Sequence, residues 1–223
     1  MLRRRKPEPD SWDYLFVITY GRSGSTLLQA ILNSIPGYAI RGENGGAVKH
    51  LWRFHREMTQ RSRSRRRALA LPRDNPWWGI DGFDESLSAE QLRGVVDRTI
   101  LRPPPGTRVT GFKEVRYLGP DTPDYVMWLA DTFPGARFVF NSRNLDDVVV
   151  SDWWRERADA REFLDGVQQM QDELRIRLGE RAFDVRYDDY TADPAVLAGL
   201  FVWLGEPFDR SQVESVLSRK HGY

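Results

Sequence analysis

The chain lacks cysteine, has only three histidines and contains no long apolar run. Without cysteine it cannot form disulfide bonds, thiolate nucleophiles or metal sites with cysteine ligands. The three histidines are too scattered along the chain for a zinc site. The basic N-terminus continues into Pro7 and Glu8 instead of an apolar segment, and the run from Tyr14 to Tyr20 is too short to span a bilayer. We therefore expect a soluble, cytoplasmic protein without a membrane span.

Neither sign of charge is in excess. The 33 lysines and arginines balance 32 aspartates and glutamates, and the net charge of +1 argues against binding of nucleic acid through overall charge. Arginines do gather in the run RSRSRRR at 61–67. We interpret this run as a solvated segment, and the alternative is a basic cover that recruits an anionic acceptor or cofactor.

The chain does have enough apolar sequence for a folded core. Its 223 residues are 40% hydrophobic and 12% aromatic, which excludes wholesale disorder and favours a single domain over 1–223. Runs rich in β-branched and aromatic residues predict strands at 14–19, 38–40, 108–113, 136–143 and 182–187. Helical spacing and helix-ending signals predict helices at 27–35, 87–101, 126–132, 145–157 and 194–205. The polar, arginine-rich stretch 44–85 is expected to be irregular or a mobile cover, with a helix near 48–58.

This alternation of strands and helices predicts an α/β fold with three layers, in which helices flank a central, mostly parallel sheet. Ligands of such sheets bind at the carboxyl ends of the strands. Four polar segments directly follow predicted strands, namely Gly21–Thr26, Glu43, Lys113 and Arg143. We therefore expect these segments to meet in one site.

The loop after the first strand has the composition of an anion site. Gly21 and Gly24 allow a close approach of the backbone, Arg22 adds a positive charge, and the side chains of Ser23, Ser25 and Thr26 can donate hydrogen bonds. The N-terminus of the following helix favours negative charge as well. The loop lacks the Gly-Lys-Ser/Thr core of nucleotide triphosphatases, so we do not predict an ATPase. The alternative is a tight turn in which Ser25 caps a helix.

Three segments resemble one known family. YGRSGSTLL resembles the 5′-phosphosulfate loop of sulfotransferases that use 3′-phosphoadenosine 5′-phosphosulfate (PAPS), in which Lys or Arg stands at the position of Arg22. FVFNSRNLDDVVVSDWW resembles their 3′-phosphate motif, an Arg at a strand end and a Ser eight residues later, here Arg143 and Ser151. VRYDDYTADP is similar to the family's Tyr-Glu-Asp-Leu segment, which implies that Tyr187 lies near the adenine; the alternative is a tyrosine of the core. Asp188 replaces the usual Glu, so the role of that carboxylate is open.

The resemblance runs in pieces from about residue 14 to 208 and is closest to bacterial and carbohydrate-type members. It implies a fold like that of P-loop NTPases, with a variable acceptor-side insertion at about 44–105. The glycine-rich adenine motif of the small-molecule cytosolic branch is absent, and Arg219 or Lys220 is left to take its place.

The chemistry that the resemblance implies is in-line transfer of a sulfuryl group from PAPS to a hydroxyl of a small-molecule or glycan acceptor, without a metal ion. Arg22 and Lys113 would stabilise the charge of the leaving group, and the alternative for Lys113 is a solvated lysine. Glu43, in YAIRGENGG, resembles the Gly-Glu-Asn segment of bacterial members and would be the base. A turn glutamate is the alternative, and His50 and His55 are the substitute bases.

Acceptor contacts are expected from His50, Trp52 and Arg116. Two other functions compete with sulfuryl transfer. One is a small-molecule kinase of the P-loop class, which the missing lysine and metal-binding aspartate argue against. The other is a non-enzymatic protein that binds anions or nucleic acid through the arginine run, which the near-neutral charge argues against.

Overall fold

The structure is a computed structural model that describes residues 12–65 and 71–219. Arg66, Arg67 and Lys220, which entered the predictions above, lie outside the described residues. A five-stranded sheet stands at the centre of the fold, in the order β2-β3-β1-β4-β5, and every pair in it is parallel. Its strands are β1 (Asp13–Ile18), β2 (Tyr38–Arg41), β3 (Val109–Glu114), β4 (Arg137–Ser142) and β5 (Ala182–Arg186). The predicted parallel α/β sheet is thereby confirmed.

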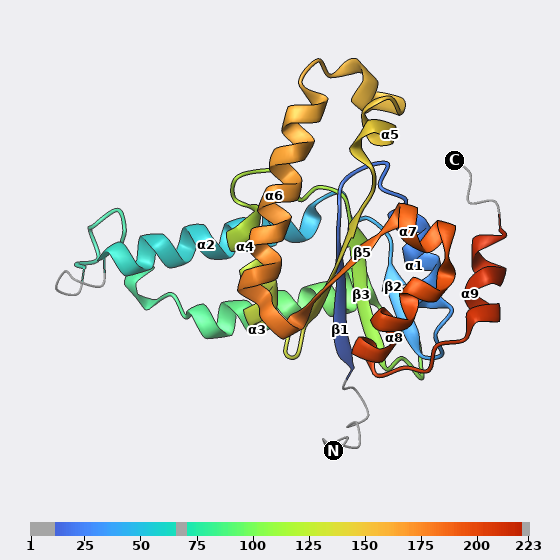
Figure 1. The fold of residues 1–223 in the computed structure, drawn as a ribbon. Helices are drawn as coiled ribbons and strands as arrows, with labels where there is room; N and C mark the ends of the chain where they lie inside the picture. Colours follow the sequence, from blue (N-terminus) through green and yellow to red (C-terminus); the bar gives the residue numbers. More distant parts are fainter. Residues whose placement is uncertain (1–11, 66–70, 220–223) are drawn as a thin grey trace.

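Helices cover both faces of the sheet (Figure 1). In chain order they are α1 (Ser25–Asn33), α2 (Ala47–Arg65), α3 (Glu85–Val96), α4 (Thr122–Thr132), α5 (Leu145–Val149), α6 (Ala160–Leu178), α7 (Tyr187–Ala192), α8 (Ala198–Leu204) and α9 (Arg210–Leu217). Short helical turns, one of them a π-helix, occupy Ile80–Gly82, Asp97–Leu101, Asp152–Glu156, Gly179–Arg181 and Pro194–Leu197. No helix in the described parts of the chain is both long and apolar enough to cross a membrane. The cytoplasmic location stays a prediction.

The alternation of side chains along β1 explains the two layers of core. Phe16 and Ile18 point to one face, where they pack with residues of α2, α4 and α6. Leu15 and Val17 point to the other face and pack with α1, α8 and α9. Because β1 is central and buried on both faces, it reads as a continuous apolar run in the sequence.

Two helices differ from those expected. In the stretch 44–85 the helix expected near 48–58 is longer and extends over Ala47–Arg65 as α2, whereas residues 71–84 contain turns and the short helical turn Ile80–Gly82. Arginine is a good helix former, and α2 buries Val48 and Trp52 on one face while Arg53, Arg61 and Arg63 are exposed. The long projection of α2 beyond the sheet is evident in Figure 1.

The helix expected over 145–157 is broken. It ends at Val149, and Ser151 has extended backbone before a short turn at Asp152–Glu156. Three consecutive valines at 148–150 are poor helix formers, and the Ser151 hydroxyl donates to the carbonyl oxygen of Val148 at 2.7 Å. Ser151 therefore lies beyond α5 rather than two turns along it.

Candidate active site

The loop between β1 and α1 has the backbone shape of an anion-binding turn. Arg22 and Gly24 both have left-handed backbone, with φ of 67° and 77°. Gly24 directly precedes α1, so the main-chain N–H groups of the first helical turn point toward the loop. The side chains of Arg22 and Thr26 are exposed there. A loop of this shape can hold a phosphate or a sulfate.

The serines of the loop are buried, which corrects part of the prediction. The Ser23 hydroxyl lies 2.6 Å from the Thr19 hydroxyl, and its side chain is fully buried. Thr19 in turn donates to the carbonyl oxygen of Asn141. Ser23 thus uses its hydroxyl to brace the loop, and Ser25 is also buried, so Thr26 presents the exposed hydroxyl.

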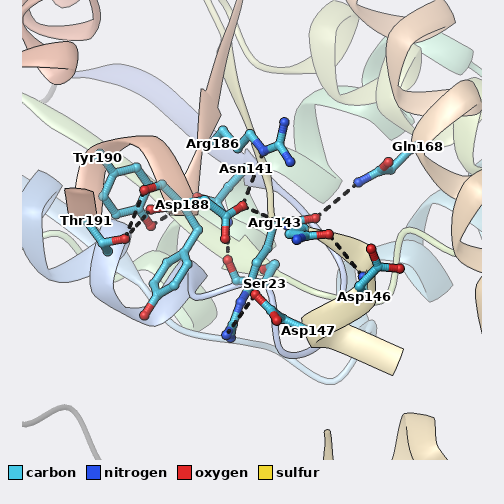
Figure 2. A network of polar contacts seen from close by, with 12 residues as sticks. Ser23, Asn141, Arg143, Asp146, Asp147, Gln168, Arg186, Asp188, Tyr190 and Thr191 are labelled. Atoms are coloured by element: carbon cyan, nitrogen blue, oxygen red, sulfur yellow. Dashed lines mark hydrogen bonds and ion pairs between the residues drawn. The ribbon is translucent and has the colours of Figure 1, made fainter. Parts of the chain in front are cut away.

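Strand β4 holds the loop from the side. The Asn141 amide donates to the carbonyl oxygen of Ser23 at 2.8 Å and accepts from the Tyr190 hydroxyl at 3.2 Å. Figure 2 shows this network at the end of β4. Asn141 is fully buried, and the other buried residues of β4 are apolar, so its amide binds the loop rather than solvent. A polar residue in the middle of such a strand was the sequence signal for this role, and it was missed.

Arg143, two residues after Asn141, points toward the same loop. Its Nη1 donates to the carbonyl oxygen of Arg22 at 3.3 Å, and its guanidinium lies 4.7 Å from the ring centre of Tyr187. Its Nη2 is 4.0 Å from a carboxylate oxygen of Asp147. Arg143 Nε is buried and has no hydrogen-bond partner within the described residues. The structure therefore brings together Arg22, Arg143 and Tyr187, as the sequence predicted.

Tyr20 fixes the backbone of Arg143. Its hydroxyl donates to the carbonyl oxygen of Arg143 and accepts from the N–H of the same residue, both at 3.0 Å. Gln168 of α6 donates to this hydroxyl as well, at 2.8 Å. Burial raises the pKa of Tyr20, so the phenol stays protonated and able to donate. Tyr20 is the first residue of the segment YGRSGSTLL but had no role assigned from the sequence, and Gln168 lies outside the three motifs.

Asp188, whose role was open, supports the turn after Arg143. Its carboxylate accepts from the N–H of Asn144 at 2.7 Å and from Arg186 Nε at 3.2 Å. The neighbouring Tyr187 covers the loop Gly21–Thr26, the candidate phosphate loop, because a Cβ built on Gly24 would lie 2.0 Å from Cδ2 of its ring. Only glycine fits position 24 in this arrangement.

A second cluster lies at the ends of β2 and β3. Lys113 Nζ donates to Glu43 Oε1 at 2.6 Å, and the lysine side chain is only 5% exposed whereas that of Glu43 is 42% exposed. Both residues line a cleft of about 480 Å³. The rest of its lining comes from the loop after β2 and from one face of α1, namely Gly42, Thr26, Gln29, Ala30 and Asn33. Because Thr26 lies on both the phosphate loop and the cleft, the two clusters are adjacent.

The expected acceptor contacts divide into two groups. His50 at the start of α2 and Arg116 after β3 are exposed on the side of the sheet where the strands end. Trp52 is 3% exposed and packs in the core against Tyr125, with ring centres 5.5 Å apart. The structure thus gives Trp52 a packing role rather than the acceptor contact that was expected of it.

Glu114 is a buried site residue that sequence reasoning passed over. It is 2% exposed, and its carboxylate accepts hydrogen bonds from four main-chain N–H groups. Two of these belong to Asn44 and Gly46, in the loop that carries Glu43. The signal in the sequence was a second charged residue at the end of a buried strand, directly after Lys113.

The strand order and the glycine-containing loop between β1 and α1 define an α/β protein with a P-loop-like fold. Residues 14–210 match the Sulfotransferase family, and the chain belongs to that family. No curated protein matches the chain.

Solved structures with the same fold include two sulfotransferase domains. That of the Synechococcus PCC 7002 olefin synthase has 18% identity and a TM-score of 0.55, over 97% of this chain and 82% of its own. That of the curacin biosynthetic pathway has 16% identity and a TM-score of 0.54, over 91% and 77%. Mouse sulfotransferase SULT7A1, solved in complex with PAP, has 13% identity and a TM-score of 0.50, over 92% of this chain and 63% of its own.

Proposed function

We propose that the protein transfers a sulfuryl group from PAPS to a hydroxyl of a small-molecule or glycan acceptor, with Glu43 as the base. The observation that carries this proposal is the adjacency of two sites at one edge of the sheet. Arg143 and the phosphate loop form the first, and the Glu43–Lys113 pair beside its cleft forms the second. Membership in the Sulfotransferase family supports the same reaction class.

The residues at the first site fit a nucleotide with 3′- and 5′-anionic groups. The loop and the start of α1 offer main-chain N–H groups to the 5′ end. Arg143 offers a guanidinium whose buried Nε has no partner in the described chain, which suits an anionic oxygen of the 3′-phosphate. Tyr187 stands beside both groups and is the candidate for adenine contact. SULT7A1 was solved with PAP, the product that PAPS would leave here.

The chain's own residues would divide the chemistry as follows. PAPS supplies the activated sulfuryl group, and no metal ion is required in this proposal. Glu43 faces the cleft and takes the proton of the acceptor hydroxyl. Lys113 holds the Glu43 carboxylate in place, and together with Arg22 it provides positive charge for the leaving phosphate.

The lining of the cleft suits a polar acceptor. Thr26, Gln29 and Asn33 face it from α1, and the large exposed aromatic side chains lie elsewhere in the described chain. A hydroxyl on a sugar-like or similarly polar molecule fits these groups better than a bare aromatic ring does. We assign the stretch 44–105 to the acceptor side of a single domain over 1–223.

The first test is calorimetry with 3′-phosphoadenosine 5′-phosphate (PAP), with ADP as the matched control that lacks the 3′-phosphate. Micromolar binding of PAP with weak binding of ADP is the expected result, because only PAP engages Arg143. Equal or stronger binding of ADP or ATP, or no nucleotide binding, would reject the proposal. PAP release from PAPS, with methyl glucoside and 4-nitrophenol as acceptor probes, then measures turnover.

A further inference from the structure

The end of strand β3 holds the Glu43 loop from two faces of the sheet. Lys113 and Glu114 are consecutive, so their side chains point to opposite faces. In the register of the sheet they lie beside Val17 and Ile18 of β1, which belong to the two different core layers. Lys113 contacts the Glu43 carboxylate itself, and Glu114 contacts the main chain that follows Glu43.

The Glu114 carboxylate is bound on both of its oxygens. Oε2 accepts from the N–H groups of Asn44 at 3.2 Å and Gly46 at 3.0 Å. Oε1 accepts from the N–H groups of Val115 at 2.9 Å and Arg116 at 3.2 Å. One buried carboxylate thus ties the turn after β3 to the loop after β2. Hydrogen bonds to a charged acceptor are the strong kind, so this tie is a firm one.

The loop that carries Glu43 needs such a tie. Residues 42–46 read Gly-Glu-Asn-Gly-Gly, and Gly45 and Gly46 have left-handed backbone with φ of 66° and 79°. Three glycines in five residues give this segment little stiffness of its own. Its two N–H bonds to Glu114 flank Gly45 and begin at the residue directly after Glu43. The position of the Glu43 carboxylate therefore depends on Glu114.

Hydrogen bonds of Asn44 also connect the loop that carries Glu43 to helix α2. The main-chain oxygen of Asn44 accepts from Ala47, and its side-chain oxygen accepts from the N–H of Val48, so the loop merges with the first turn of the helix. A carboxylate at the N-terminus of a helix is favoured by the helix dipole. Glu114 thus fixes the loop between two rigid elements, strand β3 and helix α2.

The geometry points to Glu114 as a positioning residue that sets the place of Glu43 in the active site. This inference rests on the proposed function, in which Glu43 is the base. Glu114 touches neither the acceptor nor the cofactor in this assignment, and it acts through the loop at 44–46. Its loss should therefore lower kcat rather than cofactor affinity, because a shift of the base by about 1 Å costs up to about 100-fold in rate.

The test compares Glu114→Gln, Glu114→Asp and Glu43→Gln, and it combines Glu114→Gln with Glu43→Gln. The amide of Gln places N–H groups opposite two of the four donors, so the loop should loosen. We expect kcat of Glu114→Gln to fall about 10–100-fold with unchanged PAP affinity, and Glu114→Asp to recover part of the loss. The double variant should be no slower than Glu43→Gln alone, because both changes act through one group.

The matched control is Glu206→Gln, a mostly buried carboxylate that accepts from Arg108 Nη1 directly before β3, at the opposite end of that strand. It should change stability without changing kcat. Additive effects in the double variant, or an unchanged kcat in Glu114→Gln, would overturn the inference.

Amide hydrogen exchange over residues 42–48 separates this inference from the proposed function. Faster exchange in Glu114→Gln is expected even if Glu43→Gln proves fully active. That combination would support the role of Glu114 in holding residues 44–46 and would reject Glu43 as the base. Unchanged exchange would overturn the role of Glu114 whichever residue is the base.

Discussion

Lys113 Nζ lies 2.6 Å from Glu43 Oε1 across the ends of two neighbouring strands. The lysine is buried and the glutamate is partly exposed, so the ammonium depends on this carboxylate while the carboxylate still faces the cleft. An unpaired ammonium at a buried position is strongly unfavourable. The pair is therefore built into the fold, and it places a carboxylate where an acceptor hydroxyl can reach it.

Glu43→Gln should abolish most of the turnover. The amide keeps the shape but cannot accept the proton, so we expect PAP release from PAPS to slow by about 10²–10⁴-fold with PAP affinity nearly intact. Glu57→Gln, on the exposed face of α2, is the control and should leave the rate unchanged. Full activity of Glu43→Gln would place the base elsewhere, and His50 would be tested next.

Arg143→Ala should weaken PAP binding by about 1.5–3 kcal/mol, the usual value of a hydrogen bond to a charged group. Calorimetry measures this directly. Arg137→Ala is the control, because Arg137 begins the same strand and donates to the carbonyl oxygen of Trp203 at its other end. Equal PAP affinity in wild type and Arg143→Ala would remove Arg143 from the site.

The sheet and the placement of the Gly21–Thr26 loop and Arg143 directly after its strands were predictable because they depend on local patterns. Buried parallel strands appear as apolar runs, and a Gly-Ser loop between a strand and a helix has its own signature. The family resemblance was found from these segments, and the match over residues 14–210 confirms it. Glu43 and Lys113 were expected at one edge of the sheet because each directly follows a predicted strand, and the pairing of β2 with β3 makes them neighbours there.

The missed residues act through contacts that are distant in sequence. Gln168 meets Tyr20 across 148 positions, and Asn141 meets Ser23 across 118. No local spacing encodes such pairs. Likewise, Ser23 reads as an available donor in the sequence, and only the fold shows that Thr19 takes its hydroxyl. The sequence thus predicts at which edge of the sheet the site forms. The residues that hold the site residues in place through long-range hydrogen bonds are identified only by the structure.

Tyr20→Phe should loosen Arg143 without removing its charge. Loss of the hydroxyl leaves the carbonyl and N–H of Arg143 without this partner, so stability should fall by about 1–3 kcal/mol. PAP affinity should fall as well, by less than in Arg143→Ala. The matched control is Tyr14→Phe, which loses hydrogen bonds to Asp97 and should affect stability alone. Identical PAP affinity in Tyr20→Phe and wild type would contradict the role of Tyr20.

Gly24→Ala should damage the phosphate loop through a steric clash. The added Cβ would lie 2.0 Å from the Tyr187 ring, and left-handed backbone at φ 77° adds about 1–2 kcal/mol of strain for alanine. Gly135→Ala separates the two effects, because Gly135 has φ 69° and no atom within 4 Å of its Cβ position. We expect Gly135→Ala to lower stability only, and Gly24→Ala to lower stability further and to weaken PAP binding. Similar losses of stability in the two variants would show that Tyr187 moves aside.

His55 should make the stability of the protein depend on pH. Its ring packs between α2 and α3, with Nδ1 3.0 Å from the Ser88 hydroxyl, and burial lowers the pKa of His55 below its usual value. As pH falls through about 6.5, the imidazole of His55 is protonated in the unfolded chain while it is still neutral in the folded protein. The free energy of unfolding therefore decreases with falling pH until the pKa of His55 in the folded protein is reached. Above that window the imidazole is neutral in both states and contributes no slope. Urea unfolding between about pH 7 and 5 should show a shallower dependence for His55→Gln than for wild type. Parallel curves for the two proteins would mean that burial does not hold His55 neutral.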